Sequence, residues 1–181
     1  MNSNSMRLNP YWNKGSGIQL TGLIHLMCNL KNRGFVKQNY VEVGSYFGES
    51  ALIASSFDFI DRIFCIDLFN QHNQIESCKK LLSHTKKPIE YIKQESIEAV
   101  NIFEDKSIDI LYIDACHSYE CVKDDLNCWH TKVRDGGFIC GHDYNPKSHS
   151  AVIKAVDEFV ELKNLKIDQI FCDTSFLIVN N

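Results

Sequence analysis

The chain has 181 residues, 44% of them hydrophobic and 23% charged, which predicts one globular domain with a full core. Its formal net charge of −4 at pH 7, without a dense run of lysine and arginine, excludes the electrostatic footprint of a nucleic-acid-binding protein. No stretch approaches the roughly 20 apolar residues of a membrane span, and the start lacks the apolar core of a signal peptide, so we expect a cytoplasmic protein that binds no membrane.

Hydrophobic periodicity divides the chain into alternating helices and strands. An amphipathic helix is predicted over residues 18–33, where Gly34 supplies the stop signal. Strands are predicted at residues 40–43, 62–68, 89–93, 108–113, 138–141, 166–172 and 175–179. Further helices are predicted at residues 50–57, 74–83, 97–103, 119–132 and 150–162.

This alternation indicates an α/β fold, because strands that alternate with helices form βαβ units and a mostly parallel sheet. Only Asp173 and Thr174 separate the last two strands, too few residues for a crossover helix, so these strands must form an antiparallel hairpin. We therefore expect a Rossmann-like, seven-stranded, mostly parallel sheet with an antiparallel C-terminal strand and helices on both faces. Residues 1–34 are expected to form an N-terminal segment and helix that cover the site, and residues 35–181 the main domain.

A glycine-containing turn follows the first strand of the main domain. Gly44 and Gly48 allow a tight turn and a close approach of the backbone to a ligand, although a turn without a ligand would look the same. Tyr46 stands where the dinucleotide-binding fingerprint places its second glycine, which makes room for a pyrophosphate. The spacing therefore weighs against a nicotinamide or flavin enzyme.

The next two strand ends carry polar residues suited to an adenosine-containing cofactor. Asp67, at the tip of the second strand, is placed to accept hydrogen bonds from both ribose hydroxyls, although an isolated acid there could also cap a helix. Together with Glu42 and the glycine turn, it favours ribose binding. Ser96 follows the third strand, where it would either contact adenine or cap the next helix.

Acids and histidines gather after the fourth and fifth strands. Asp114 and His117 follow the fourth strand, and His142 and Asp143 follow the fifth. In open α/β sheets, ligands bind beyond the carboxyl ends of the strands. Two carboxylates and two imidazoles at one edge of the sheet are therefore a candidate reaction centre.

The eight cysteines show no C-x-x-C spacing, so they do not indicate a zinc site. Cys65, Cys140 and Cys172 fall within predicted strands, where a free cysteine behaves as a small hydrophobic residue. We expect structural thiols in a reducing compartment rather than a disulfide framework.

Residues 35–179 resemble the class I S-adenosylmethionine-dependent methyltransferases. The resemblance is carried by residues 42–50, 65–67, 113–126 and 136–144. The Asp-x-x-His-x-Tyr motif at 114–119 and the Gly-His-Asp-Tyr motif at 141–144 resemble a subgroup related to macrocin O-methyltransferase and to proteins labelled cephalosporin hydroxylase. The resemblance implies a methyltransferase whose main domain binds S-adenosylmethionine. The cofactor-binding residues that we predict are Glu42, Gly44, Ser45, Tyr46, Gly48, Ser50, Asp67, Ser96 and Asp114.

The resemblance also implies how the reacting end works. The expected reaction is O-methylation of a hydroxyl in a small molecule or glycan, with His117, Asp114 and Asp143 as catalytic residues. His117 stands where catechol-type relatives hold their base, and an unperturbed histidine pKa of about 6.5 suits that role. Alternatively, it caps a helix or bonds Asp114 structurally.

A divalent cation, Mg²⁺ or Mn²⁺, is the second device that the resemblance implies, with Asp114, His142 and Asp143 as ligands. His142 stands where metal-dependent relatives usually carry an acid, and imidazole is a poor ligand for Mg²⁺. Either His142 binds nothing, or the metal is not Mg²⁺, or no metal is bound.

Several alternatives remain open at this point. The chain could be a nucleotide-cofactor oxidoreductase of the NAD type, or a methyltransferase-like protein that binds the cofactor but is catalytically silent. Tyr119 and Tyr144 could line the acceptor pocket or belong to the core, and the pair Asp124 and Asp125 is expected to be solvated. A homodimer is also open, because the sequence does not fix the oligomeric state.

Overall fold

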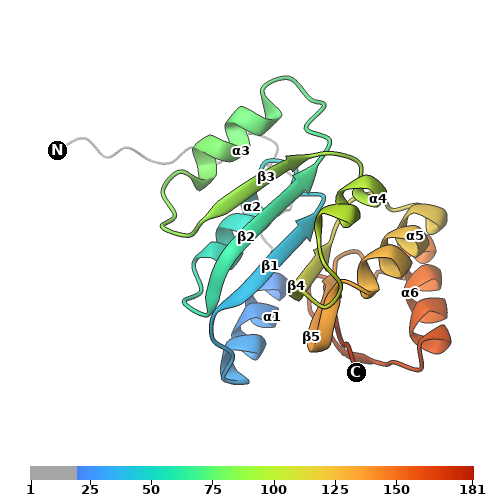
Figure 1. The fold of residues 1–181 in the computed structure, drawn as a ribbon. Helices are drawn as coiled ribbons and strands as arrows, with labels where there is room; N and C mark the ends of the chain where they lie inside the picture. The colour runs from blue at the N-terminus through green and yellow to red at the C-terminus, as the bar shows by residue number, and fades with distance from the viewer. Residues whose placement is uncertain (1–19) are drawn as a thin grey trace.

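The computed structural model describes residues 20–181, in which one sheet lies between two layers of helices (Figure 1). The strands are β1 (Gln38–Val43), β2 (Ile60–Asp67), β3 (Ile89–Lys93), β4 (Ile108–Ile113), β5 (Val133–Gly141), β6 (Ile167–Ile170) and β7 (Phe176–Val179). The helices are α1 (Thr21–Asn32), α2 (Glu49–Ser55), α3 (Gln74–Leu82), α4 (Ser96–Ala99), α5 (Tyr119–His130) and α6 (Ser150–Leu162), with a 3₁₀ turn at Val100–Ile102.

The strand order is β3-β2-β1-β4-β5-β7-β6. The first five strands are parallel, and β7 runs antiparallel to both β5 and β6. This confirms the predicted fold class and the C-terminal hairpin. The order reverses between β1 and β4, and such a switch point is where open α/β sheets bind ligands.

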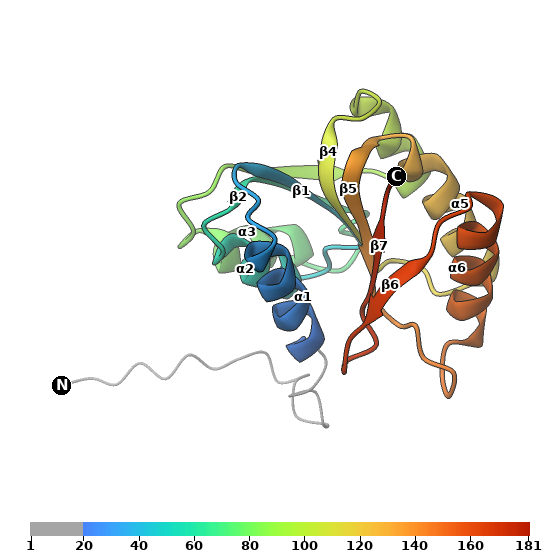
Figure 2. The ribbon, with the colours of Figure 1, turned by 90° about the horizontal axis from the view of Figure 1, so that it is seen from below.

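Both faces of the sheet are buried, as expected for parallel strands covered by helices. Successive residues of a strand point to opposite faces, so Tyr40 packs with the side that carries α1, α2 and α3, while Val41 packs with α4, α5 and α6. Figure 2 shows these two helical layers on either side of the sheet. Tyr112 and Trp129 are among the largest fully buried side chains, one in each half of the core.

Helix α1 belongs to the layer that it shares with α2 and α3. Its start is held by Asp173 in the C-terminal hairpin, whose Oδ2 accepts a 2.9 Å hydrogen bond from the backbone N–H of Leu23. A Cβ on Gly22 would lie 1.7 Å from Asp173 Oδ1, so this close approach needs a glycine. The rest of the segment predicted to cover the site, residues 1–19, lies outside the described residues.

The structure differs from the sequence prediction mainly at the ends of elements. Strand β5 begins at Val133, five residues before the predicted start, because Val133 pairs with Ile108 on β4. Strand β6 ends at Ile170, so Cys172 lies in the hairpin turn and is exposed, and its assignment to an apolar strand was wrong. None of the helices in the described part of the chain has the length and apolar character that crossing a bilayer requires.

Candidate active site

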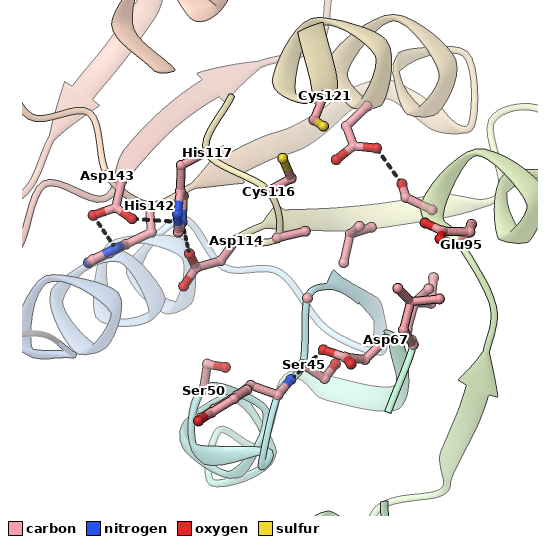
Figure 3. Close-up of a pocket in the computed structure, with 18 of the residues that line it drawn as sticks. Ser45, Ser50, Asp67, Glu95, Asp114, Cys116, His117, Cys121, His142 and Asp143 are labelled. Carbon is pink, nitrogen blue, oxygen red and sulfur yellow. Dashed lines mark hydrogen bonds and ion pairs between the residues drawn. The ribbon is translucent and has the colours of Figure 1, made fainter. Parts of the chain in front are cut away.

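A pocket of about 860 Å³ opens beyond the carboxyl ends of the parallel strands, within the usual size range of small-ligand sites (Figure 3). Ten of the residues singled out from the sequence line it: Gly44, Ser45, Tyr46, Ser50, Asp67, Ser96, Asp114, His117, His142 and Asp143. Glu42 and Gly48 lie outside this lining. The strand tips therefore meet in one cavity, as predicted.

Gly44 lets the turn after β1 touch the loop after β4. Its φ is +92°, and a Cβ there would lie 2.1 Å from the carbonyl oxygen of Asp114. The Asp114 N–H donates a 2.8 Å hydrogen bond to the carbonyl of Val43, which fixes the contact from the other side. Gly48 also has a φ of +92°, but its Cβ would meet the sulfur of Cys78, so this glycine permits α2 to pack against α3.

Glu42 lies fully buried behind the glycine turn. Its Oε1 accepts a 3.0 Å hydrogen bond from the Tyr40 hydroxyl, and burial raises the pKa of the Glu42 carboxyl to about 7. Among the described residues, Glu42 Oε2 and Ser45 Oγ make no hydrogen bond of good geometry, although the side chains of Ser45 and Ser50 lie close enough to the Glu42 carboxyl to lower its pKa. Because buried polar atoms are normally well paired, a polar ligand group in the pocket would complete the hydrogen bonding of the Ser45 hydroxyl.

Asp67 is held in place by the chain around it. Its Oδ2 accepts the backbone N–H of Tyr46 at 2.9 Å, and its Oδ1 accepts that of Phe69 at 2.7 Å. The buried Gln74 donates a third, 3.3 Å hydrogen bond to Oδ1 while it accepts one from the N–H of Gln71. Gln74 was missed from the sequence, because it reads as an ordinary first residue of a helix.

Ser96 and Asp125 form a pair that the sequence did not reveal. The Ser96 hydroxyl donates to Asp125 and accepts a 2.8 Å hydrogen bond from the indole N–H of Trp129. Asp125 is only 4% exposed, and burial raises its pKa to about 6. The expectation of a solvated acidic pair was therefore wrong for Asp125, which also lines the pocket with Asp124. Ser96 does not cap helix α4, whose N-cap position is Glu95.

Beyond the ends of β4 and β5, His117 lies between the two predicted acids. Its Nε2 is 2.9 Å from Asp143 Oδ2 and 3.5 Å from Asp114 Oδ1 (Figure 3). His142 approaches the other oxygen of Asp143, with 3.1 Å between Nδ1 and Oδ1. The predicted reaction centre is thus assembled from the tips of β4 and β5.

These contacts change the protonation of the cluster. Asp114 and Asp143 accept hydrogen bonds from His117 and raise the pKa of its imidazole to about 10. Burial opposes ionisation of Asp143, but hydrogen bonds from His117 and His142 hold the pKa of that carboxyl well below its usual range. At neutral pH, His117 is therefore an imidazolium paired with carboxylates, and its pKa is not the unperturbed value expected from the sequence.

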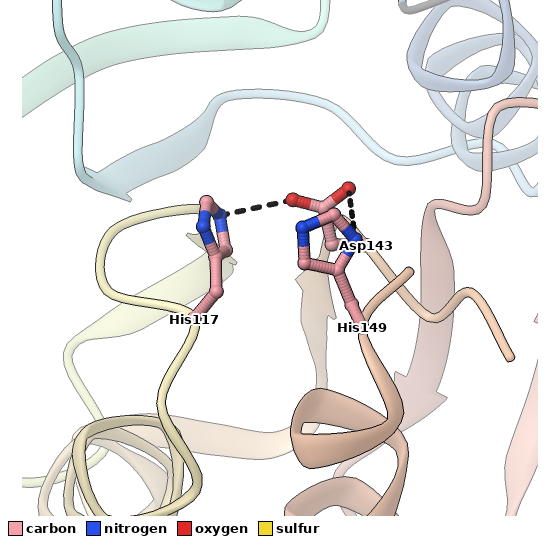
Figure 4. Close-up of side chains that lie close together, drawn as sticks. All are labelled: His117, Asp143 and His149. Carbon is pink, nitrogen blue, oxygen red and sulfur yellow. Dashed lines mark ion pairs between the residues drawn. The ribbon is translucent and has the colours of Figure 1, made fainter. Parts of the chain in front are cut away.

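His149, at the start of α6, joins the cluster from a third segment. Its Nδ1 lies 3.4 Å from Asp143 Oδ1 and 2.8 Å from the hydroxyl of Ser148, and its ring centroid is 5.0 Å from that of His117 (Figure 4). The sequence analysis missed His149, because it stands in no motif and only the path of the loop after β5 brings it back to the strand tips.

Two sets of three potential metal ligands share Asp143. Asp114, His142 and Asp143 form the predicted set, and His117, Asp143 and His149 form a second one. In each set the ligand atoms lie within 4.8 Å of one another.

The two tyrosines considered for the acceptor pocket lie outside its lining. Tyr144 donates a 2.7 Å hydrogen bond to Asp157, and Tyr119 donates one to Glu158, both on helix α6. Their hydroxyls therefore tie the start of α5 and the loop after β5 to this helix.

Comparison with known proteins agrees with this architecture. Residues 41–144, more than half of the chain, match the model of a family described as a methyltransferase domain. A relative, uncharacterized protein R132 of Acanthamoeba polyphaga mimivirus, is 33% identical over 149 residues, which are 75% of this chain and 66% of that protein. The chain therefore spans slightly less than two thirds of that relative.

Solved structures show the same fold. CalS11, described as a TDP-rhamnose 3'-O-methyltransferase, superposes with a TM-score of 0.65 at 15% identity, over 86% of this chain and 77% of that one. The O-methyltransferase NovP superposes with a TM-score of 0.62 at 14% identity, over 90% and 79% of the two chains. The chain therefore belongs to the methyltransferase-domain family and has the fold of the class I S-adenosylmethionine-dependent methyltransferases.

Proposed function

We propose that this enzyme transfers a methyl group from S-adenosylmethionine to a hydroxyl oxygen of a small molecule or sugar. The observation that carries the proposal is the position of His117, which lies between Asp114 and Asp143 in the same pocket as Asp67. Proton transfer from a hydroxyl needs such groups within hydrogen-bond reach. The description of CalS11 and NovP as O-methyltransferases supports oxygen as the acceptor atom.

The residues of the cofactor end fit S-adenosylmethionine. The pocket has the necessary volume, and the hydroxyl of Ser45, which lacks a hydrogen bond of good geometry, lies in its wall. In this proposal, Asp67 binds the ribose and Ser96 lies on the adenine side. The methionine half is contacted by the turn residues Gly44, Ser45, Tyr46 and Ser50, with Asp114 beside them, while Glu42 and Gly48 support the turn from behind. When bound, S-adenosylmethionine supplies an electrophilic methyl group on a sulfonium.

At the acceptor end, the side chains must orient the hydroxyl and take its proton. We assign proton acceptance to Nδ1 of His117, because its other ring nitrogen, Nε2, donates to Asp143 and Asp114, which hold the ring. The new bond joins the acceptor oxygen to the methyl carbon, the methyl–sulfur bond breaks, and S-adenosylhomocysteine is the other product. Since His117 is an imidazolium at neutral pH, it must first release a proton, unless a cation activates the hydroxyl instead.

A divalent cation would be held by Asp114, His142 and Asp143 in this proposal. Their ligand atoms are close enough for one ion, and a set with one imidazole suits Mn²⁺ better than Mg²⁺. Such an ion would lower the pKa of the acceptor hydroxyl. His149, with His117 and Asp143, offers the alternative set.

The test is a methyl-transfer assay with S-adenosylmethionine and a panel of nucleotide sugars, catechols and simple glycosides. Mass spectrometry of the products is expected to show a methyl group on oxygen, together with release of S-adenosylhomocysteine. Methylation on nitrogen only, or no release above the acceptor-free background while the cofactor binds, would contradict the proposal.

The cation is tested in the same assay after treatment with a chelator. Activity is expected to return with Mn²⁺ more fully than with Mg²⁺, and His142→Ala should lose this response while His149→Ala keeps it. The reverse pattern would assign the ion to the second set, and full activity in chelator would remove the cation from the proposal.

A further inference from the structure

Two thiols in the pocket wall have no part in the proposed reaction. Cys116 lies in the loop after β4, and Cys121 lies in the first turn of α5. Both line the pocket, and in Figure 3 their sulfur atoms point toward each other. The sequence predicted only structural thiols, because the two cysteines are five residues apart and form no recognisable motif.

The hydroxyl of Ser118 contacts both cysteines. It is the N-cap of α5, and its Oγ accepts a 3.4 Å hydrogen bond from the backbone N–H of Cys121. The same Oγ accepts a 3.3 Å hydrogen bond from the thiol of Cys116. The cap therefore fixes the start of the helix and the end of the loop at one point, with both thiols beside the pocket.

The pair is also asymmetric, as a reactive pair needs to be. The two thiols share a hydrogen bond. Cys116 is exposed and Cys121 is half-buried. Of two neighbouring thiols, the exposed one is the one that an oxidant reaches first.

A second thiol pair in the same chain provides an internal comparison. Cys65 on β2 and Cys78 on α3 also share a hydrogen bond, but both are fully buried. The contact with Cys78, together with burial, raises the pKa of Cys65 far above its usual range. Two thiol pairs therefore exist in contrasting surroundings, and only that of Cys116 and Cys121 faces the pocket.

We propose that Cys116 and Cys121 form a reversible disulfide when the enzyme meets a two-electron oxidant such as hydrogen peroxide, and that this weakens cofactor binding. The Cys116 thiolate attacks peroxide to give a sulfenic acid and hydroxide, which takes up the displaced proton as water. The Cys121 sulfur then attacks the sulfenic sulfur, and a second water leaves. Both thiols are oxidised and one peroxide is reduced.

Closing this bond would change the wall of the cofactor pocket. The loop at residues 115–118 has no regular structure and must move to bring Cys116 onto Cys121. It follows Asp114 directly and touches the glycine turn, since Ala115 Cα would lie 2.7 Å from a Cβ on Gly44. The disulfide is therefore expected to disturb the contact between the loops after β1 and β4.

Peptide mapping tests the modification directly. Trypsin cleaves after Lys106 and Lys123, so one peptide holds both Cys116 and Cys121, and Cys128 falls in the next. After peroxide and alkylation, the 107–123 peptide should lack two hydrogen atoms and carry no alkyl group, and dithiothreitol should reverse this. Cys116→Ser should abolish the product, while Cys128→Ser, on the same helix, should leave it unchanged.

The outcomes that overturn the modification are equally specific. Oxidation of Cys65 and Cys78 before the pocket pair would contradict it, as would a Cys116 sulfinic acid beside an alkylated Cys121.

Calorimetric titration with S-adenosylhomocysteine tests the consequence. Oxidised enzyme is expected to bind at least about tenfold more weakly than reduced enzyme, about 1.4 kcal/mol, with recovery after reduction. Equal affinities would overturn the effect on binding. Failure of the reduced enzyme to bind would count against the cofactor assignment, and the peptide map would still decide the disulfide.

Discussion

The two ends of the pocket are built in different ways. At the cofactor end, Asp67 is held by backbone N–H groups of its own neighbourhood, at Tyr46 and Phe69. At the acceptor end, Asp143 is surrounded by the imidazoles of its neighbour His142, of His149 just before α6, and of His117 from the loop after β4. The cofactor end is thus fixed by chain geometry, whereas the acceptor end depends on a balance of charges. Substitutions at the acceptor end should therefore lower turnover, whereas substitutions at the cofactor end should lower cofactor affinity or stability.

The largest expected effect is at the acceptor end. His117→Ala should lower turnover by about 10²–10⁴-fold, the usual contribution of a general base, with little change in affinity for S-adenosylhomocysteine. Steady-state kinetics with an identified acceptor and calorimetric titration measure the two quantities. His84→Ala, an exposed histidine away from the pocket, is the matched control. A loss of cofactor affinity as large as the loss of turnover would show that the two ends are not separable.

The next effect concerns the contact that joins the two ends. Gly44→Ala should lower the free energy of unfolding by about 3 kcal/mol, because the new Cβ is strained by the positive φ and collides with Asp114. Gly34→Ala is the matched control, since Gly34 also has a positive φ but nothing lies within 4 Å of its Cβ position. It should cost only about 1 kcal/mol. Equal losses in urea denaturation would mean that the close approach is not required.

The smallest effect should appear as a pH dependence of stability at the cofactor end. Between about pH 4.3, the ordinary glutamate value, and pH 7, the unfolded chain loses the Glu42 proton while the folded protein keeps it. The unfolding free energy therefore falls as pH rises through this window. Glu42→Gln, which keeps an acceptor for Tyr40, should remove about 2 kcal/mol of the decline between pH 5 and pH 8. Asp125 contributes its own slope to both proteins, so it cancels in the comparison. If the unfolding free energies of the wild type and Glu42→Gln change equally with pH, Glu42 is ionised in the folded protein and the prediction is wrong.

Much of the fold could be predicted from the sequence, because most helices and strands are marked by patterns within a few neighbouring residues. The strands at 89–93 and 108–113 and the last long helix at 150–162 have the predicted bounds, since each is an apolar or periodic run between turn residues. The start of β5 could not be predicted, because Gly136 and Gly137 interrupt the apolar run, and only pairing with β4 extends the strand backwards.

The site was predictable where its residues follow strands and not where distant segments meet. Asp67, Asp114, His117 and Asp143 stand at strand tips, and parallel topology brings strand tips together. Asp125 reaches the pocket from helix α5 and His149 from the loop before α6, and only tertiary packing decides where these segments lie. The raised pKa of His117 likewise results from two carboxylates that approach one ring, which no spacing in the sequence reveals.

Calorimetric titration of Asp67→Ala and His117→Ala with S-adenosylhomocysteine tests the central claim most directly, namely that the cofactor binds at the Asp67 end and the acceptor is activated at the His117 end. Asp67→Ala should weaken binding by at least about tenfold, because hydrogen bonds to a charged group contribute about 1.5–3 kcal/mol, while His117→Ala should stay within about twofold of the wild type. Unchanged binding by Asp67→Ala, or an equal loss in both variants, would contradict this division of the pocket.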